Sequence, residues 1–149
     1  MYFQCKKLKK VDLTPLNTTK VTNMSGIFTL CESLESVLVN GLNTANVTTM
    51  NNIFDRCYSL KSADISSWNT QNVTTFKRMF YKCNSISEVK LKCSKTSLAE
   101  SGVEEMFNNC YMLTSVDMSA FDFNNANNFP SIFCECKSLQ TVICGKSNT

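Results

Sequence analysis

The chain has 149 residues, of which 43% are hydrophobic and 18% are charged, and its formal net charge is +3. These values are typical of a folded globular protein and exclude disorder along the whole chain. The positive charge is small and dispersed, which argues against a nucleic-acid partner. No apolar run approaches the roughly 18 residues that a membrane-spanning helix needs, so we expect no membrane insertion.

An aromatic residue followed three positions later by cysteine recurs along the chain. The aromatic residues are Tyr2, Phe28, Phe54, Phe80, Phe107 and Phe133, and the cysteines are Cys5, Cys31, Cys57, Cys83, Cys110 and Cys136. Successive cysteines are 26 residues apart, except for one interval of 27. We therefore expect residues 1–149 to form a single repeat domain of about five and a half repeats. We also expect the chain to be a fragment of a longer protein.

Residues 47–72 illustrate the elements of one repeat in chain order. In residues 47–57, apolar side chains recur at intervals of three and four, which predicts a short helix. Residues 60–65 alternate between apolar and polar and predict a short half-buried strand. Residues 66–72 are rich in Ser, Asn and Thr and predict a turn. The residues expected to cap the helices are Thr22, Thr48, Thr74, Ser101 and Asn127.

One repeat cannot bury its apolar face alone, so neighbouring repeats are expected to stack with their strands in parallel. The predicted fold class is an α/β solenoid. It is a leucine-rich-repeat-like right-handed superhelix, with short parallel strands on one face and short helices on the other. The stretch from Leu91 to Gly102 is one residue too long and lacks the Asn-Thr turn. We expect a reshaped loop there, in which Leu98 replaces the missing apolar turn residue.

The repeat resembles that of the BspA-like leucine-rich-repeat surface proteins over essentially the whole chain. The best instance is Trp68-Asn-Thr-Gln-Asn-Val-Thr-Thr-Phe-Lys-Arg-Met-Phe-Tyr-Lys-Cys-Asn-Ser-Ile86. The resemblance implies an exported bacterial or protist protein, at the cell surface or secreted, whose repeats act in adhesion. The chain departs from the family pattern in its fourth repeat and at Cys144, where the family has Leu or Val.

Catalytic and metal chemistry have little support in the sequence. The chain contains no histidine, which removes the usual general base and most mixed metal sites. We expect no enzyme activity, no metal site and no cofactor. The six marker cysteines are expected to form a buried ladder of thiols. Disulfides between neighbouring repeats, a metal held by Cys134 and Cys136 with Cys110 or Cys144, and a thiol redox protein remain as alternatives.

The exposed side of the predicted strands is the candidate binding face, because side chains alternate between core and solvent along a strand. Its candidate residues are Asp12, Ser36, Leu38, Ser62, Asp64, Glu88, Lys90, Ser115, Asp117, Thr141 and Ile143. We expect this face to bind a host or extracellular protein, or a glycan. The alternative function is a structural spacer that holds another domain away from the cell surface. End-to-end self-association is also expected, because the terminal repeats lack polar caps.

Overall fold

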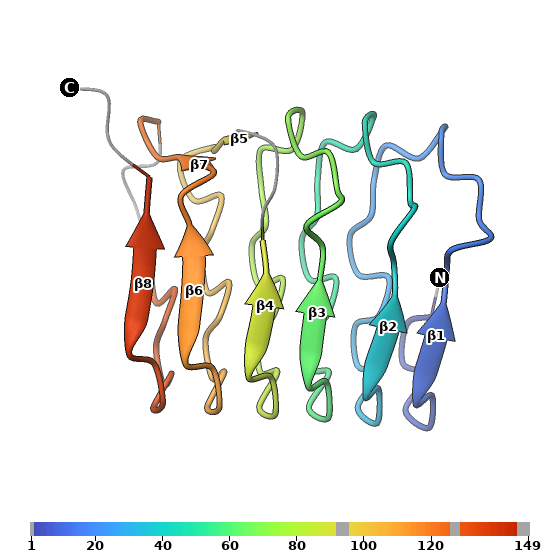
Figure 1. The fold of residues 1–149 in the computed structure, drawn as a ribbon, viewed down its shortest axis with the longest axis horizontal. Helices are drawn as coiled ribbons and strands as arrows, with labels where there is room; N and C mark the ends of the chain where they lie inside the picture. Colours follow the sequence, from blue (N-terminus) through green and yellow to red (C-terminus); the bar gives the residue numbers. More distant parts are fainter. Residues whose placement is uncertain (1, 92–95, 126–128, 146–149) are drawn as a thin grey trace.

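The computed structural model describes residues 2–91, 96–125 and 129–145, and successive repeats lie side by side in it (Figure 1). Six strands form a row in which all of them point the same way. They are β1 (Lys10–Asp12), β2 (Ser36–Leu38), β3 (Ser62–Asp64), β4 (Glu88–Lys90), β6 (Ser115–Met118) and β8 (Thr141–Cys144). Two further short strands, β5 (Thr96–Ser97) and β7 (Phe121–Asp122), lie beyond the carboxyl ends of the row.

The described strands pair in parallel, as the sequence predicted. β1 pairs with β2, β3 with β4, and β6 with β8. The partners occupy the same position in consecutive repeats, so that Val11 lies opposite Val37 and Ala63 lies opposite Val89. The repeat therefore sets the register, and each column of the sequence becomes a row across the molecule.

Residues that were predicted to form short helices form turns instead. The described ranges contain no helix, so the prediction of helices is wrong for them. The N–H groups of Asp55, Cys57 and Leu60 each donate to the carbonyl three residues earlier, at 3.0–3.2 Å. A run of such turns places apolar side chains every three or four residues, as a helix does. Alternate N–H groups donate instead to the next repeat, as Phe54 N does to Met79 O at 2.8 Å. These bonds between repeats take the donors that a helix would use internally.

Left-handed backbone recurs at two positions in each repeat and interrupts any helix there. Asn52 and Arg56 have φ of 55° and 60°, and Arg78 and Lys82 have φ of 55° and 58°. This conformation costs a residue with a side chain about 1–2 kcal/mol. The N–H of Arg56 donates to Tyr81 O at 2.7 Å and that of Lys82 to Asn108 O at 2.8 Å, so bonds between repeats offset the cost.

Thr48, which was expected to cap a helix, forms a hydrogen bond between repeats instead. Thr48 Oγ1 donates to Thr22 O of the preceding repeat at 3.3 Å, which links two repeats rather than capping a helix. Asn46 and Asn72 donate through Nδ2 to Thr19 O and Ala45 O, both at 2.8 Å. These polar side chains thus hold neighbouring turns together. Asn127 lies outside the described residues.

The core of the turn side is a column of stacked aromatic rings. Tyr2, Phe28, Phe54, Phe80, Phe107 and Phe133 stack in that order, with centroids 5.3–5.7 Å apart and planes within 14° of parallel. Phe28, Phe54, Phe80 and Phe107 are fully buried. Since each ring contacts the rings of both adjacent repeats, the column extends the hydrophobic core along the whole row.

The fourth repeat differs from the others, as its irregular sequence predicts. Leu98 is buried, which agrees with its expected role as a replacement apolar residue. β5 and β7 add a parallel pair that the regular repeats lack. Gly102 approaches the third repeat so closely that a Cβ there would lie 2.6 Å from Thr74 O. Residues 92–95, including Cys93, fall outside the described ranges.

Candidate functional site

The sheet face is built by strands that carry a single inward side chain between two outward ones. The inward residues Val11, Ala63, Val89 and Val116 are buried. The eleven candidate residues all lie in β1, β2, β3, β4, β6 and β8. All are exposed except Asp64, which is half-buried. The structure therefore places every candidate residue on one of the six strands of the row, whose order Figure 1 shows.

Charged side chains meet at the centre of this face, between β3 and β4. Lys90 Nζ lies 3.7 Å from Asp64 Oδ2 and 3.9 Å from Glu88 Oε1. Exposed ion pairs of this kind contribute little to the free energy of unfolding. These side chains can therefore leave one another and bind groups of another molecule at little cost in free energy. The hollow between them, completed by Ser62 and Ala63, measures only about 50 Å³. That volume holds one or two water molecules, so this face suits a broad partner better than a small molecule.

The three aspartates of the face also accept hydrogen bonds that fix the turn after each strand. Asp64 Oδ1 accepts hydrogen bonds from Ser66 N at 3.1 Å and Ser66 Oγ at 2.6 Å. Asp12 accepts the same pair of bonds from Thr14, and Asp117 accepts one from Ser119 N at 2.9 Å. Sequence reasoning missed this role, although Asp-x-Ser/Thr at the end of a strand is a known turn signal.

These turn bonds change the acidity of the aspartates. The hydrogen bond from the Ser66 hydroxyl, followed by that from its N–H, lowers the pKa of Asp64. The corresponding bonds from Thr14 and Ser119 lower the pKa of Asp12 and Asp117. Since the carboxylates are needed in their charged form for the turns, Glu88 and Lys90 are the cleaner probes of binding.

The exposed apolar residues of the face do not meet. Leu38 is 55% exposed on β2 and Ile143 is 51% exposed on β8, with β3, β4 and β6 between them in the row. A contiguous apolar patch would favour an obligate protein interface. The separation of the two leaves the face mainly polar, with isolated apolar anchors.

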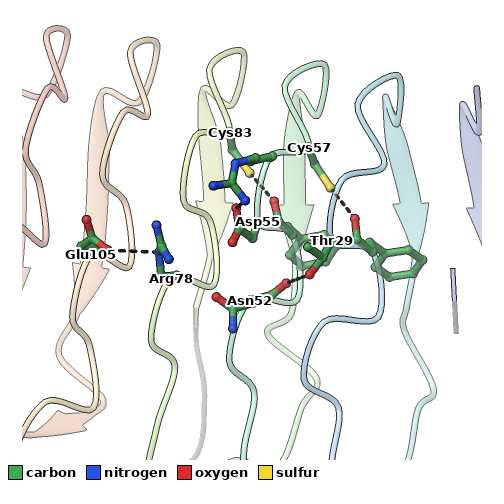
Figure 2. Close-up of polar contacts among 10 residues, drawn as sticks. Thr29, Asn52, Asp55, Cys57, Arg78, Cys83 and Glu105 are labelled. Carbon is green, nitrogen blue, oxygen red and sulfur yellow. Dashed lines mark hydrogen bonds and ion pairs between the residues drawn. The ribbon is translucent and has the colours of Figure 1, made fainter. Parts of the chain in front are cut away.

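Cysteine thiols form the expected ladder only in part. Cys31, Cys57, Cys83 and Cys110 are buried, whereas Cys136 is half-buried and Cys5 is exposed. Each thiol from Cys31 to Cys136 donates to a carbonyl of the preceding repeat at 3.0–3.2 Å, as Cys57 does to Phe28 O and Cys83 to Phe54 O (Figure 2). Cys5 is exposed because no described repeat precedes its own. All described cysteines are free thiols.

Burial is the main reason why these thiols are weakly acidic. It raises the pKa of Cys57, Cys83 and Cys110 well above the ordinary thiol value. A thiol that stays protonated is a poor nucleophile and a poor metal ligand. The described residues contain no group of three His, Cys, Asp or Glu side chains placed to hold a metal ion.

A polar cluster on the turn side was not anticipated. Cys134 is exposed, whereas Thr29, Asp55 and Asn108 in the same column of the repeat are buried. Repeats stacked on either side cover these side chains, and no single repeat reveals that from its own sequence.

Comparison with known protein families gave one match. The family described as "Mycoplasma protein of unknown function, DUF285" matches residues 1–111 and 95–148. Neither the curated proteins nor the solved structures contain a match to the chain. In the described ranges, no helix is long and apolar enough to cross a membrane.

Proposed function

The chain belongs to the DUF285 family, whose description names no function, and we propose that it is a non-enzymatic binding module acting through its sheet face. The observation that carries this proposal is a contrast between two kinds of column. The inward strand column is almost uniformly valine, from Val11 to Val142. The outward column that follows it in the repeat is varied, and changes from Asp12 to Leu38 and from Asp64 to Lys90. A uniform core with a varied surface is how repeat scaffolds carry specific binding faces.

The proposed architecture is a leucine-rich-repeat-like solenoid. Parallel strand pairs, bonds between equivalent turns and the stacked ring column support it. The motif quoted above supports kinship with the BspA-like surface proteins. A place at the cell surface or outside the cell follows from that resemblance and belongs to the same proposal.

The proposed partner is a host or extracellular protein, or a glycan, that covers several strands at once. The shallow centre of the face and the spacing of its exposed side chains favour a broad contact over a small-molecule site. Glu88 and Lys90 are the residues we expect to contribute most, because they are exposed and make no turn bonds that the fold requires. Electrostatic complementarity at such a face mainly sets specificity and the rate of association.

Charge reversal at the centre of the face tests the proposal. We expect Glu88→Lys together with Lys90→Glu to weaken binding of the fluorescent chain to cultured epithelial cells about tenfold or more, in flow cytometry. Lys20→Glu is the control, since Lys20 is exposed and lies outside the strands. Equal binding by the doubly reversed chain and the unaltered chain would sink the sheet-face proposal.

The spacer function is the second candidate, and the unbroken ring column favours it because such a column stiffens the row. A spacer requires no binding by the sheet face, so it predicts that the reversed chain and the unaltered chain behave alike. End-to-end self-association remains part of the proposal and can be measured by sedimentation. Phe129 and Val142, which are 45% and 37% exposed near the last described repeat, are the apolar residues that it would cover.

A further inference from the structure

A hollow of about 500 Å³ lies on the turn side, away from the sheet face. Its lining consists of Phe3, Ser25, Gly26, Thr29, Asn52, Asp55 and Arg78, which come from four consecutive repeats. Gly26, Asn52 and Arg78 occupy one column of the repeat, and Phe3, Thr29 and Asp55 occupy another. Gly26, which has no side chain, stands where the next two repeats carry Asn52 and Arg78. Variation from repeat to repeat therefore creates the hollow, and its volume lies in the range of small-molecule sites.

Asp55 is the most unusual residue of the lining. It is only 4% exposed, and its Oδ1 has no hydrogen-bond partner among the described residues. Arg56 Nη1 lies 3.5 Å from this oxygen, within ion-pair distance but without a hydrogen bond. Burial raises the pKa of Asp55, although Arg56, Arg78 and Lys82 oppose that effect. A buried acceptor without a donor is costly, so a ligand hydroxyl that donates to Asp55 would be favoured.

Arg78 is fixed in place on the other side of the hollow. Its Nε lies 3.0 Å from Glu105 Oε2, within ion-pair distance but without a hydrogen bond. Its guanidinium carbon lies 4.1 Å from the centre of the Tyr81 ring. Figure 2 shows Arg78 and Glu105 facing each other, with Asp55, Asn52 and Thr29 beside them. Thr29 Oγ1 donates to Asn52 O at 2.7 Å. The hollow thus presents a preorganised set of donors and acceptors in which the positive charge is already balanced.

The chemistry of the lining selects among classes of ligand. An anion would meet the Asp55 carboxylate and an arginine already paired with Glu105. A metal ion would find a single carboxylate and a neighbouring guanidinium. An apolar ligand would find one apolar side chain, Phe3, which is 57% exposed. A neutral polyhydroxy ring fits all of the groups, because its hydroxyls both donate and accept and its C–H face can lie against Phe3.

We propose that this hollow binds one sugar residue of a glycan, with Asp55 and Asn52 bonded to its hydroxyls and Phe3 stacked on its ring. Because Asp55 Oδ1 is buried in the unliganded chain, the Asp55 side chain has to move toward the hollow for this oxygen to reach the ligand. The site is separate from the sheet face and does not depend on binding there. It adds a small-molecule specificity to a chain whose sheet face offers only a shallow surface.

Titration of the 15N-labelled chain with simple sugars tests this site. The probes are the methyl glycosides of glucose, galactose, mannose and N-acetylglucosamine. We expect at least one of them to shift the amide signals of Gly26 and Asn52 saturably, with a Kd on the order of 1–10 mM. Asp55→Asn should weaken that binding about tenfold, because a charge-assisted hydrogen bond becomes a neutral one.

A second variant blocks the hollow without changing Asp55. Gly26→Asn places in the hollow the residue that the next repeat carries at the same position, where Asn52 has φ of 55° and Gly26 has φ of 68°. We expect it to abolish sugar binding while lowering the free energy of unfolding by about 1 kcal/mol, the cost of left-handed backbone at a residue with a side chain, so that the chain stays folded. Glu88→Gln on the sheet face is the matched control and should bind normally. The proposal is overturned if no sugar shifts these signals at about 50 mM, or if Gly26→Asn binds as the unaltered chain does.

Discussion

The strand side and the turn side of each repeat are held together by different means. On the strand side, three or four residues pair with a neighbour and bury one side chain between two exposed ones. On the turn side, aromatic rings stack on those of adjacent repeats, thiols donate to the preceding repeat and alternate backbone N–H groups donate to the next repeat. The turn side therefore supplies most of the cohesion, which leaves the outward side chains of the strands free to differ. Separation of cohesion from recognition lets a uniform repeat carry a varied surface.

Removal of one ring from the stacked column should have the largest effect. Phe54 is fully buried between Phe28 and Phe80, and we expect Phe54→Ala to lower the free energy of unfolding by about 3–5 kcal/mol. Val89→Ala is the matched change on the strand side. It should cost about 1–2 kcal/mol, since Ala63 fills the same column in the adjacent repeat. Urea unfolding followed by circular dichroism gives both values, and equal losses would contradict the division between the two sides.

The buried thiols should give the next effect, as a dependence of stability on pH. Burial raises the pKa of Cys57, Cys83 and Cys110 above the ordinary thiol value of 9.0. As the pH rises above that value, the unfolded chain releases protons that the folded chain keeps, so the folded state loses stability. Each such thiol should steepen the fall by up to about 1.4 kcal/mol per pH unit.

Two alanine variants separate this effect from other titrations at high pH. Cys83→Ala should make the fall in unfolding free energy between about pH 9 and 10 shallower. Cys144→Ala, which removes an exposed thiol from β8, should leave the slope as it was. Identical slopes in Cys83→Ala and in the unaltered chain would show that the ladder thiols are not protected by folding.

The sequence predicted the columns and the strands well because both follow from the period. The strand expected within residues 60–65 is β3, at Ser62–Asp64, and every residue assigned to the sheet face lies on a strand. The helices could not be predicted, because an interval of three or four residues fits a helix and a series of turns equally. What decides between them is the hydrogen bonding to the neighbouring repeat, as from Phe54 N to Met79 O.

The polar groups of the turn side were missed for a related reason. Asp55 lies close to Arg56 from its own repeat and feels the charge of Arg78 from the next repeat. It lines the same hollow as Phe3, which comes from an earlier repeat. The period aligns equivalent positions, but it does not show how unlike residues from different columns meet. By contrast, the turn bonds of Asp12 and Asp64 are local, and the Asp-x-Ser/Thr pattern could have revealed them.

Glycine substitutions should give the smallest effect, and its sign should differ between the two sides. Lys82 lies on the turn side with φ of 58°, where glycine adopts the left-handed backbone without strain. We expect Lys82→Gly to raise the free energy of unfolding by about 0.5–1 kcal/mol, after loss of the contact between Lys82 Nζ and the Tyr81 ring at 5.3 Å. Lys90 lies in β4, and Lys90→Gly should lower it by about 0.5–1 kcal/mol, because glycine weakens a strand. If urea unfolding shows changes of opposite sign in the two unfolding free energies, the left-handed backbone of the turns is strained and is maintained by the stacking of the repeats. Destabilisation by both variants would mean that the Lys82 side chain, rather than its backbone, matters on the turn side.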